Sequence, residues 1–296
     1  MVAANRPGFD HQTSLASLIP VPMYNTGSSA YGFTINHTFA IPVYGAAPQL
    51  AALIESLRSQ RDVGSEILIT TSTPTLELAT FAKDHAIPLH VNPQRIDIAA
   101  DWNFAIGVTQ TPYVTLSHQD DLFAPTYVAQ LSSALRRHAG AHFAFCDYSE
   151  HTLHGPRPTN LNLWIKRVII QLTFGEQECI IKPRDKLRLL SYGNPICCPS
   201  VMLNREMLAD FRFPVGFQTN LDWMAWLNLA RRPGGFVYIA ERLVSKGIHA
   251  GSETTATIAN RARDDEDRTI FNTIWPKSIA AALAALYRIG YRANRT

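Results

Sequence analysis

Over the first half of the chain, short apolar runs of strand type alternate with longer segments in which apolar residues recur at helical spacing. The helical pattern is clearest in Pro48–Gln60, where the apolar positions are Leu50, Leu53, Ile54 and Leu57. The predicted strands are Thr38–Tyr44, Glu66–Thr71, Pro88–Val91, Tyr113–Leu116 and His142–Asp147. The predicted helices between them are Pro48–Gln60, Thr75–His85, Ile98–Val108 and Pro125–His138. This alternation predicts an α/β fold with a mostly parallel central sheet that helices cover on both sides.

The alternation ends after Ser149. Residues 150–162 include Gly155, Pro156 and Pro158 and are predicted to form a loop. Beyond them, the predicted helices are Asn162–Phe174, Pro183–Tyr192, Asn220–Ala230, Thr255–Ile274 and Lys277–Ile289, and the predicted strands are Cys198–Leu203 and Phe236–Ala240. No linker separates the halves, so we expect the second half to be built onto the first sheet. Residues 1–36 are rich in Pro, Gly, Ser and Asn and are predicted to be an irregular arm.

The composition is that of a protein with a substantial core, since 46% of the 296 residues are apolar and 17% are charged. The net charge of +3 and the lack of any run of five or more Lys or Arg residues argue against a nucleic-acid partner. The four cysteines show no zinc-type spacing, which favours a reducing cytoplasm. The sequence shows neither a signal-peptide pattern nor an apolar run near the roughly 20 residues of a membrane span, so we expect a cytoplasmic protein.

The segment Tyr113–Phe123 has the most distinctive chemistry. Its buried strand pattern runs directly into His118, Asp120 and Asp121. In an open α/β sheet, ligands bind at the carboxyl ends of the strands, and carboxylates there are costly unless they are paired or bound to a cation. Residues two apart on an extended chain point the same way, so His118 and Asp120 could hold one Mg²⁺ or Mn²⁺ ion. The alternative is a solvated Asp-Asp turn that caps the following helix.

Five segments, in order along the chain, show a family resemblance. They are Ile41–Tyr44 with the helix after it, Glu66–Ile69, Asp101–Ala105, His118–Asp121, and Leu221–Leu227 followed by Tyr238–Val244 and His249. Together they resemble the family-two glycosyltransferases, inverting enzymes with the GT-A nucleotide-sugar fold, over roughly residues 38–250. The resemblance implies a GT-A (Rossmann-like) catalytic domain at residues 37–250, with a nucleotide-sugar half at about 37–150 and an acceptor half at about 151–250. A helical C-terminal extension would follow at residues 251–296.

The resemblance also implies the residues of the site. The donor-binding residues would be Pro42, Tyr44, Thr71, Ser72, Asp101, Asn103 and Asp120. The ligands of a Mn²⁺ or Mg²⁺ cofactor would be His118, Asp120, Asp121 and His249. The partners would be a nucleotide-diphosphate sugar and an acceptor hydroxyl on a glycan or a carrier lipid, as in polysaccharide biosynthesis. The ion would neutralise the departing diphosphate.

Asp222 is the predicted general base that activates the acceptor hydroxyl. It stands at the start of a helix rich in Trp, Met and Leu, where burial would raise its pKa and make it a better proton acceptor near neutral pH. The alternative is a carboxylate that satisfies free backbone N–H groups at the helix N-terminus. Trp223 and Trp226 are the predicted acceptor-side residues. We expect one of them to face the acceptor, although core packing is the ordinary role of a Trp at helical spacing.

Two departures from the family pattern leave other functions open. The second strand ends in Thr70–Thr73, where the family commonly has acidic residues that contact the nucleotide base. His118 replaces the first Asp of the metal motif, which suits Mn²⁺ better than Mg²⁺. A non-catalytic module that binds nucleotide sugars or glycans would be compatible with the missing acidic residues at these two positions. A nucleotidyltransferase is a weaker alternative, because Tyr44–Gln49 lacks the basic residues of a triphosphate-binding loop.

Two basic segments are compatible with contacts beyond the catalytic domain. Ile279–Arg295 mixes Ala, Leu and Ile with basic residues, and such a helix can make a peripheral contact with the inner face of a membrane or pack against the catalytic domain. Lys182, Arg184 and Arg188 form a basic cluster, which is either a solvated helix face or a phosphate contact. The sequence pattern leaves both alternatives open.

Overall fold

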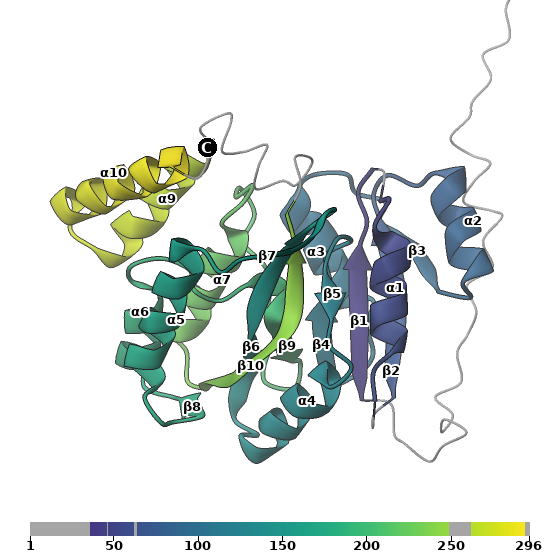
Figure 1. Cartoon of the computed structure of the whole chain (residues 1–296), viewed down its shortest axis with the longest axis horizontal. Helices are drawn as coiled ribbons and strands as arrows, with labels where there is room; N and C mark the ends of the chain where they lie inside the picture. The colour runs from purple at the N-terminus through teal and green to yellow at the C-terminus, as the bar shows by residue number, and fades with distance from the viewer. Residues whose placement is uncertain (1–35, 46, 62–63, 249–261, 294–296) are drawn as a thin grey trace, which may run out of the picture.

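A ten-stranded sheet runs through the computed structural model, which describes residues 36–45, 47–61, 64–248 and 262–293 (Figure 1). Its strands are β1 (His37–Pro42), β2 (Ser65–Thr71), β3 (Leu89–Val91), β4 (Tyr113–Leu116), β5 (Leu122–Phe123), β6 (Ala141–Thr152), β7 (Gly155–Arg157), β8 (Cys179–Ile180), β9 (Val201–Asn204) and β10 (Gly235–Gly247). The strand order is β3-β2-β1-β4-β9-β6-β10-β5, with β7 paired to β6 and β8 paired to β10. β3, β2, β1 and β4 are parallel, and β10 is parallel to β6, while β9 runs antiparallel between β4 and β6. The α/β fold with a mostly parallel central sheet is confirmed, with antiparallel strands added from the second half.

Helices cover both faces of this sheet. They are α1 (Leu50–Arg58), α2 (Leu76–Asp84), α3 (Ile98–Gly107), α4 (Tyr127–Arg137), α5 (Leu161–Phe174), α6 (Pro183–Leu190), α7 (Leu221–Ala230), α9 (Ala262–Ile274) and α10 (Lys277–Ala293). Successive residues of β1 point to opposite faces, because Phe39 and Ile41 belong to the core under α1, α2 and α4, whereas Ala40 belongs to the core under α3, α6 and α7. The strand alternation therefore produces two hydrophobic cores, one on each face.

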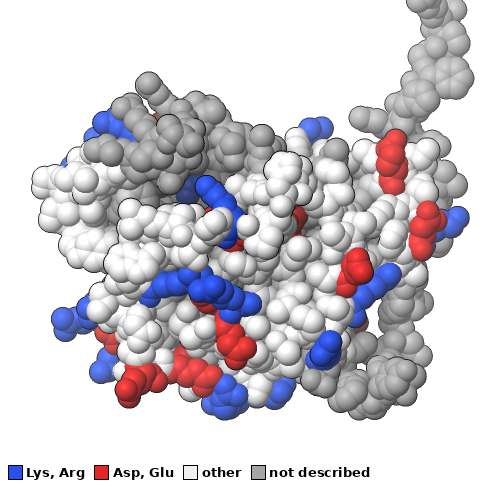
Figure 2. Space-filling model, in the orientation of Figure 1, with Lys and Arg blue, Asp and Glu red and all other residues white. Residues whose placement is uncertain are grey.

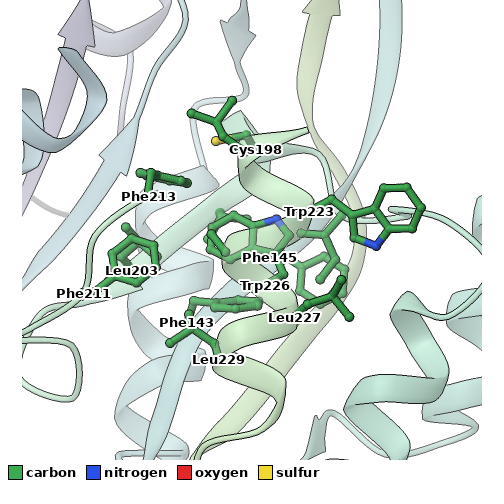
Figure 3. Packing of buried hydrophobic residues seen from close by; sticks show 14 of the residues in the cluster. Phe143, Phe145, Cys198, Leu203, Phe211, Phe213, Trp223, Trp226, Leu227 and Leu229 are labelled. Carbon is green, nitrogen blue, oxygen red and sulfur yellow. The ribbon is translucent and has the colours of Figure 1, made fainter. Parts of the chain in front are cut away.

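The core under α7 is rich in aromatic rings (Figure 3). Trp226 of α7 is fully buried, and its ring lies 4.9 Å from that of Phe143 in β6. Phe213 packs edge-on against Trp226 at 5.8 Å between ring centroids. Large buried rings of this kind dominate the energetics of a core. They fix α7 against the sheet, so the start of α7 has a defined place at the sheet edge.

The largest departure from the sequence-based elements is at β6 and β10. β6 continues to Thr152 instead of ending at Asp147 and turns back into β7, so part of the segment predicted as a loop is a hairpin. β10 extends to Gly247 and pairs with β6 along this extension. Pro156 fits because β7 is an edge strand, where the missing N–H breaks no ladder. The sequence pattern also misses β5 and β8, which have two residues each and are too short to show a period.

The C-terminal extension is helical, as expected, and α9 and α10 pack on α7 (Figure 1). The ring centroids of Trp223 and Phe271 are 5.2 Å apart, and those of Phe271 and Tyr287 are 5.3 Å apart. Within the described residues, no helix combines the length and the apolar character needed to cross a membrane. The face shown in Figure 2 has charges of both signs, without a large patch of either. The arm at residues 1–35 and residues 255–261 of the predicted helix lie outside the described part of the chain.

Candidate active site

A cleft of about 920 Å³ opens at the edge of the sheet where the parallel strands end. Its wall includes the end of β1, the connection between β4 and β5, the end of β10, and residues of α3, α5 and α7. The predicted site residues that line it are Pro42, Tyr44, Ser72, Asp101, His118, Asp120, Asp222 and Trp223. The fold therefore brings predicted donor-side and acceptor-side residues from both halves of the chain into one cleft.

Asp101 is the main acidic group where β2 meets the cleft. It lies in the first turn of α3, but the side chain that caps this helix is that of Asp97, so Asp101 is available for other contacts. Its carboxylate accepts hydrogen bonds from Oγ of Ser72 at 2.7 Å and from Nδ2 of Asn92 at 2.8 Å. A carboxylate from α3 thus lies beside the end of β2, where Thr70–Thr73 contains no acid.

Besides Asp121, three predicted site residues of the described chain do not line the cleft. Thr71 is buried, and its hydroxyl accepts a hydrogen bond of 3.0 Å from the N–H of Thr73. The Asn103 side chain binds the backbone of Phe213, accepting its N–H at 2.7 Å and donating to its carbonyl at 2.9 Å. Trp226 is enclosed in the core, so its expected position facing an acceptor is corrected (Figure 3). α7 is apolar almost all round, so its spacing did not show which ring faces the sheet.

Of the acidic pair that follows β4, Asp120 lines the cleft and Asp121 does not. The Asp121 carboxyl is buried, accepts the N–H of Gly247 at 3.0 Å and lies 3.7 Å from Nδ1 of His118. Desolvation, reinforced by the charge of Asp120, holds the pKa of Asp121 well above its usual range. Desolvation also lowers the pKa of His118 to about 4, so the imidazole is neutral at pH 7. The bond from Asp121 goes to β10 and not to α4, so Asp121 links the β4–β5 connection to β10 and does not cap α4.

Gly247 allows β10 to approach the acidic pair closely. A Cβ at this position would clash with the backbone carbonyl oxygen of Asp120 and would lie 3.0 Å from its Oδ2. The backbone of β10 therefore supports the Asp120 carboxylate from behind and limits the directions in which it can point.

The groups around Asp120 fit a divalent cation. Asp120 presents a carboxylate to the cleft, and Nε2 of His118 is buried without a hydrogen-bond partner among the described residues. A neutral imidazole is a suitable ligand for Mn²⁺. The described part of the chain has no cluster of three or more His, Cys, Asp or Glu side chains placed to hold a metal ion. An ion here would take its other ligands from substrate phosphates and water, which is usual for such cations. His249 lies outside the described residues.

Asp222 lies in the first turn of α7 and faces the cleft. Its Oδ2 accepts a hydrogen bond of 2.9 Å from Nδ2 of Asn194, and its Oδ1 accepts the N–H of Trp223 at 2.7 Å. Desolvation raises the pKa of Asp222 above that of an exposed aspartate. Each carboxylate oxygen has two lone pairs, so both oxygens can still accept another proton donor. Asp222 thus meets a backbone N–H at the helix end and also remains open to a substrate hydroxyl.

Trp223 forms part of the cleft wall but presents little of its ring. It is 1% exposed, and its indole N–H donates to the carbonyl of Leu190 at 3.1 Å. The other face of the ring packs against Phe271 and Tyr287 of the C-terminal helices. Trp223 therefore serves to dry the surroundings of the neighbouring carboxylate more than to offer a stacking surface.

Besides Arg95, three cations that the sequence reasoning did not assign to the site line the same cleft. They are Lys166 of α5, Lys246 of β10 and Arg263 of α9. All three lie close enough to Asp222 to lower its pKa, against the larger opposite influence of desolvation. Lys166 donates to the hydroxyl of Tyr148 at 3.0 Å, and desolvation lowers the Lys166 pKa to about 8. The sequence signal for Lys166 was its place beside Arg167, a basic pair inside the mainly apolar predicted helix Asn162–Phe174.

Glu266 of α9 is a second feature that the sequence reasoning missed. Its carboxylate is 9% exposed and accepts the backbone N–H groups of Gln218, of Thr219 at 3.1 Å and of Asn220 at 2.9 Å, as well as the Thr219 hydroxyl at 2.8 Å. The neighbouring Asp267 accepts a hydrogen bond of 2.8 Å from Nδ2 of Asn220. The segment 218–220 leads directly into α7. The C-terminal extension therefore holds the start of the helix that carries the candidate base.

Solved structures with a similar fold include S. aureus TarS and a mannosyltransferase. S. aureus TarS 1-349 superposes with a TM-score of 0.56 at 12% identity, over 85% of this chain and 70% of that chain, and this chain covers 43% of a longer TarS structure. The mannosyltransferase PcManGT from Pyrobaculum calidifontis, in complex with GDP-Man and Mn²⁺, superposes with a TM-score of 0.53 at 15% identity, over 77% of this chain and 61% of that chain. At these identities the likeness shows the fold alone.

Sequence comparison identifies the family. Comparison with curated proteins finds no match. The model of the family described as Glycosyl transferase family 2 matches residues 38–212, which is more than half of the 296 residues. This match covers β1, the acidic pair after β4 and β9, and it confirms the resemblance noted from the sequence segments. The chain therefore belongs to glycosyl transferase family 2.

Proposed function

We propose that this family member transfers a sugar from a nucleotide-diphosphate donor to an acceptor hydroxyl, with inversion at the anomeric carbon. The observation that supports this most strongly is a single cleft that holds both Asp120 and Asp222. Asp120 lies where α/β folds bind their ligands, and Asp222 is a desolvated carboxylate of the kind that acts as a base. The proposed catalytic domain spans residues 37–250, with donor contacts mainly in 37–150 and acceptor contacts mainly in 151–250.

The donor end is proposed to lie around Pro42, Tyr44, Ser72 and Asp101. Tyr44 is 52% exposed, and its hydroxyl accepts a hydrogen bond of 2.9 Å from Arg95. An exposed ring beside a guanidinium offers a stacking surface for a nucleotide base. The Asp101 carboxylate can accept hydrogen bonds from ribose or base, even though Thr70–Thr73 contains no acid. This arrangement favours a working nucleotide site over one that has lost its acidic group.

Asp120 and His118 would hold a divalent cation, Mn²⁺ in preference to Mg²⁺, which would supply positive charge to the leaving diphosphate. Structures of TarS with UDP-GlcNAc and of PcManGT with GDP-Man and Mn²⁺ support this class of donor and cofactor. In this proposal, Asp121 acts from behind the site, by holding β10 against the β4–β5 connection. His249 stays a predicted ligand.

Asp222 is proposed to take the proton of the acceptor hydroxyl. As the proton leaves, the acceptor oxygen forms the bond to the anomeric carbon, and the bond to the diphosphate breaks on the opposite side, which inverts the centre in one displacement. The bond from Asn194 fixes the orientation of the carboxylate, and Trp223 excludes water from one side of it. A positioned base of this kind contributes a factor of about 10²–10⁴ to the rate.

The acceptor is proposed to be a hydroxyl on a glycan or a carrier lipid in polysaccharide biosynthesis. We place the reaction in the cytoplasm. On α10, Ile279 is 43% exposed and Leu286 is 62% exposed, which gives the C-terminal extension an apolar surface for peripheral contact with the inner face of a membrane. The other face of the extension packs on α7.

A panel of UDP-, GDP- and dTDP-sugars tests the proposal, with thermal shift for binding and release of nucleoside diphosphate for turnover, each with and without Mn²⁺. We expect one donor to raise the melting temperature and to be turned over in the presence of Mn²⁺, because a ligand that binds only the native state stabilises it. Proton NMR of the product should show the inverted anomer. Tight binding without release of diphosphate under any condition would favour the binding module instead, and no binding of any donor would contradict both.

A further inference from the structure

The cations that line the cleft differ in the carboxyl groups on which their charges act. The charge of Lys246 acts on Asp121, beneath the donor end, and also on Asp222. The charged groups that act on Lys166 include Lys246, Arg263 and Asp222. Lys246 therefore acts on both carboxyl groups, whereas Lys166 and Arg263 act on Asp222 and on each other.

Lys166 has a partner that adds a second hydrogen-bond donor. Its ammonium donates to the hydroxyl of Tyr148 at 3.0 Å, and both side chains line the cleft. Desolvation holds the Tyr148 pKa well above its usual range, so the phenol keeps its proton while it accepts from Lys166 and can donate that proton into the cleft. With Arg263, this part of the cleft is lined by an ammonium, a phenol and a guanidinium. Such a set matches an oxyanion.

The same cations are unfavourable for a base that acts on a neutral acceptor. Lys166, Lys246 and Arg263 each stabilise the ionised form of Asp222 and so make it a weaker proton acceptor. A negatively charged group bound between Lys166 and Arg263 would offset two of these three charges. The basicity of Asp222 would then rise when the acceptor is in place.

We propose that Lys166, Tyr148 and Arg263 bind a phosphate group of the acceptor, so that the acceptor is a phosphorylated alcohol or a glycan that contains phosphate. This inference rests on the proposed function, because it assumes that Asp222 activates the acceptor. A phosphate monoester has up to two negative charges and three free oxygens, which match two cations and a phenol donor. A carboxylate would balance only one of the cations.

Isothermal titration calorimetry of the full chain with sn-glycerol 3-phosphate, glycerate and glycerol tests the inference. Each probe is titrated alone and again with Mn²⁺ and a saturating nucleoside diphosphate, which fills the donor end. We expect sn-glycerol 3-phosphate to bind under both conditions, at least tenfold more tightly than glycerate or glycerol. Lys166→Gln and Arg263→Gln should each weaken this binding about tenfold or more, which is the loss of one charge-assisted hydrogen bond.

Two further variants separate a specific site from charge or folding effects. Lys166→Arg keeps the positive charge and should retain binding, and Arg184→Gln removes an exposed cation of α6 outside the cleft and should leave binding unchanged. The inference is wrong if both glutamine variants bind the phosphate probe as tightly as the original chain. It is also wrong if glycerate or glycerol binds equally well, or if nucleoside diphosphate abolishes binding of the phosphate probe. Turnover of nucleotide sugars, measured separately, shows whether the proposed function itself stands.

Discussion

Glu266→Gln is the substitution for which the structure makes the strongest stability prediction. Oε2 of Glu266 accepts the N–H groups of Thr219 and Asn220 and the hydroxyl of Thr219, and Oε1 accepts the N–H of Gln218. A glutamine keeps the shape but has no charge, and it can accept at only one of the two positions. Its amide nitrogen would then face a backbone N–H, donor against donor.

The size of the effect follows from these four contacts. A hydrogen bond to a charged group contributes about 1.5–3 kcal/mol and a neutral one about 0.5–1.5 kcal/mol, so three bonds that lose their charge cost about 3 kcal/mol. One unsatisfied backbone N–H adds about 1–3 kcal/mol. We therefore expect Glu266→Gln to lower the free energy of unfolding by about 4 kcal/mol, a large share of the 5–15 kcal/mol typical of a folded domain.

Urea denaturation at 25 °C, followed by circular dichroism, measures this loss. Asp265→Asn removes a charge from the exposed residue next to Glu266 on α9 and should change the free energy of unfolding by less than about 0.5 kcal/mol. Under native conditions, Glu266→Gln should also lower kcat more than it raises the KM for the donor, because it loosens the segment that leads to Asp222. A loss below about 1 kcal/mol, or one equal to that of Asp265→Asn, would refute the view that α9 holds the start of α7.

Three further outcomes are expected. Transfer activity should fall as the pH drops through the pKa of Asp222, because a base acts only when it is ionised. Desolvation raises that pKa, so the acidic limb of a pH–rate profile should lie above the pKa range of an exposed aspartate. Gly247→Ala should lower stability by about 1–3 kcal/mol through the clash with the Asp120 carbonyl, and calorimetry should show weaker donor binding. Trp226→Phe should reduce the free energy of unfolding in a urea titration but leave the KM for the acceptor unchanged, since Trp226 lies in the core.

The elements of the first half could be predicted because periodicity and burial agree there. In α1, the residues at helical spacing are the buried ones, Leu50, Leu53, Ile54 and Leu57. β6 was predicted too short because its last residues, Tyr148–Thr152, form no apolar run. Pairing with β10 and β7, not an apolar period, decides the structure there. Strand length at a functional edge depends on partners that are distant in the sequence.

In the candidate site too, features with a local sequence pattern could be predicted and contacts between distant segments could not. The positions of Asp120 and Asp222 at the cleft could be predicted because Asp120 follows a strand and Asp222 starts a helix, and the family resemblance drew attention to both. Asp101 and Ser72 were both predicted as donor-binding residues from the family resemblance, but the hydrogen bond between them could not be predicted, because Ser72 follows β2 and Asp101 lies on α3. Glu266 reaches segment 218–220 across more than 40 residues of sequence, and no local signal marks such a contact.

In the proposed function, Asp120 helps to bind the donor and Asp222 takes the proton of the acceptor hydroxyl, and both residues line one cleft. The test of this division of roles is to measure the donor Kd and kcat of Asp222→Asn and Asp120→Asn. Both variants are assayed side by side with the donor that the panel identifies. We expect Asp222→Asn to leave the donor Kd within about twofold and to lower kcat by about 10²–10⁴, whereas Asp120→Asn should weaken donor binding in the presence of Mn²⁺. Full turnover by Asp222→Asn, or unchanged donor binding by Asp120→Asn, would contradict this division of roles.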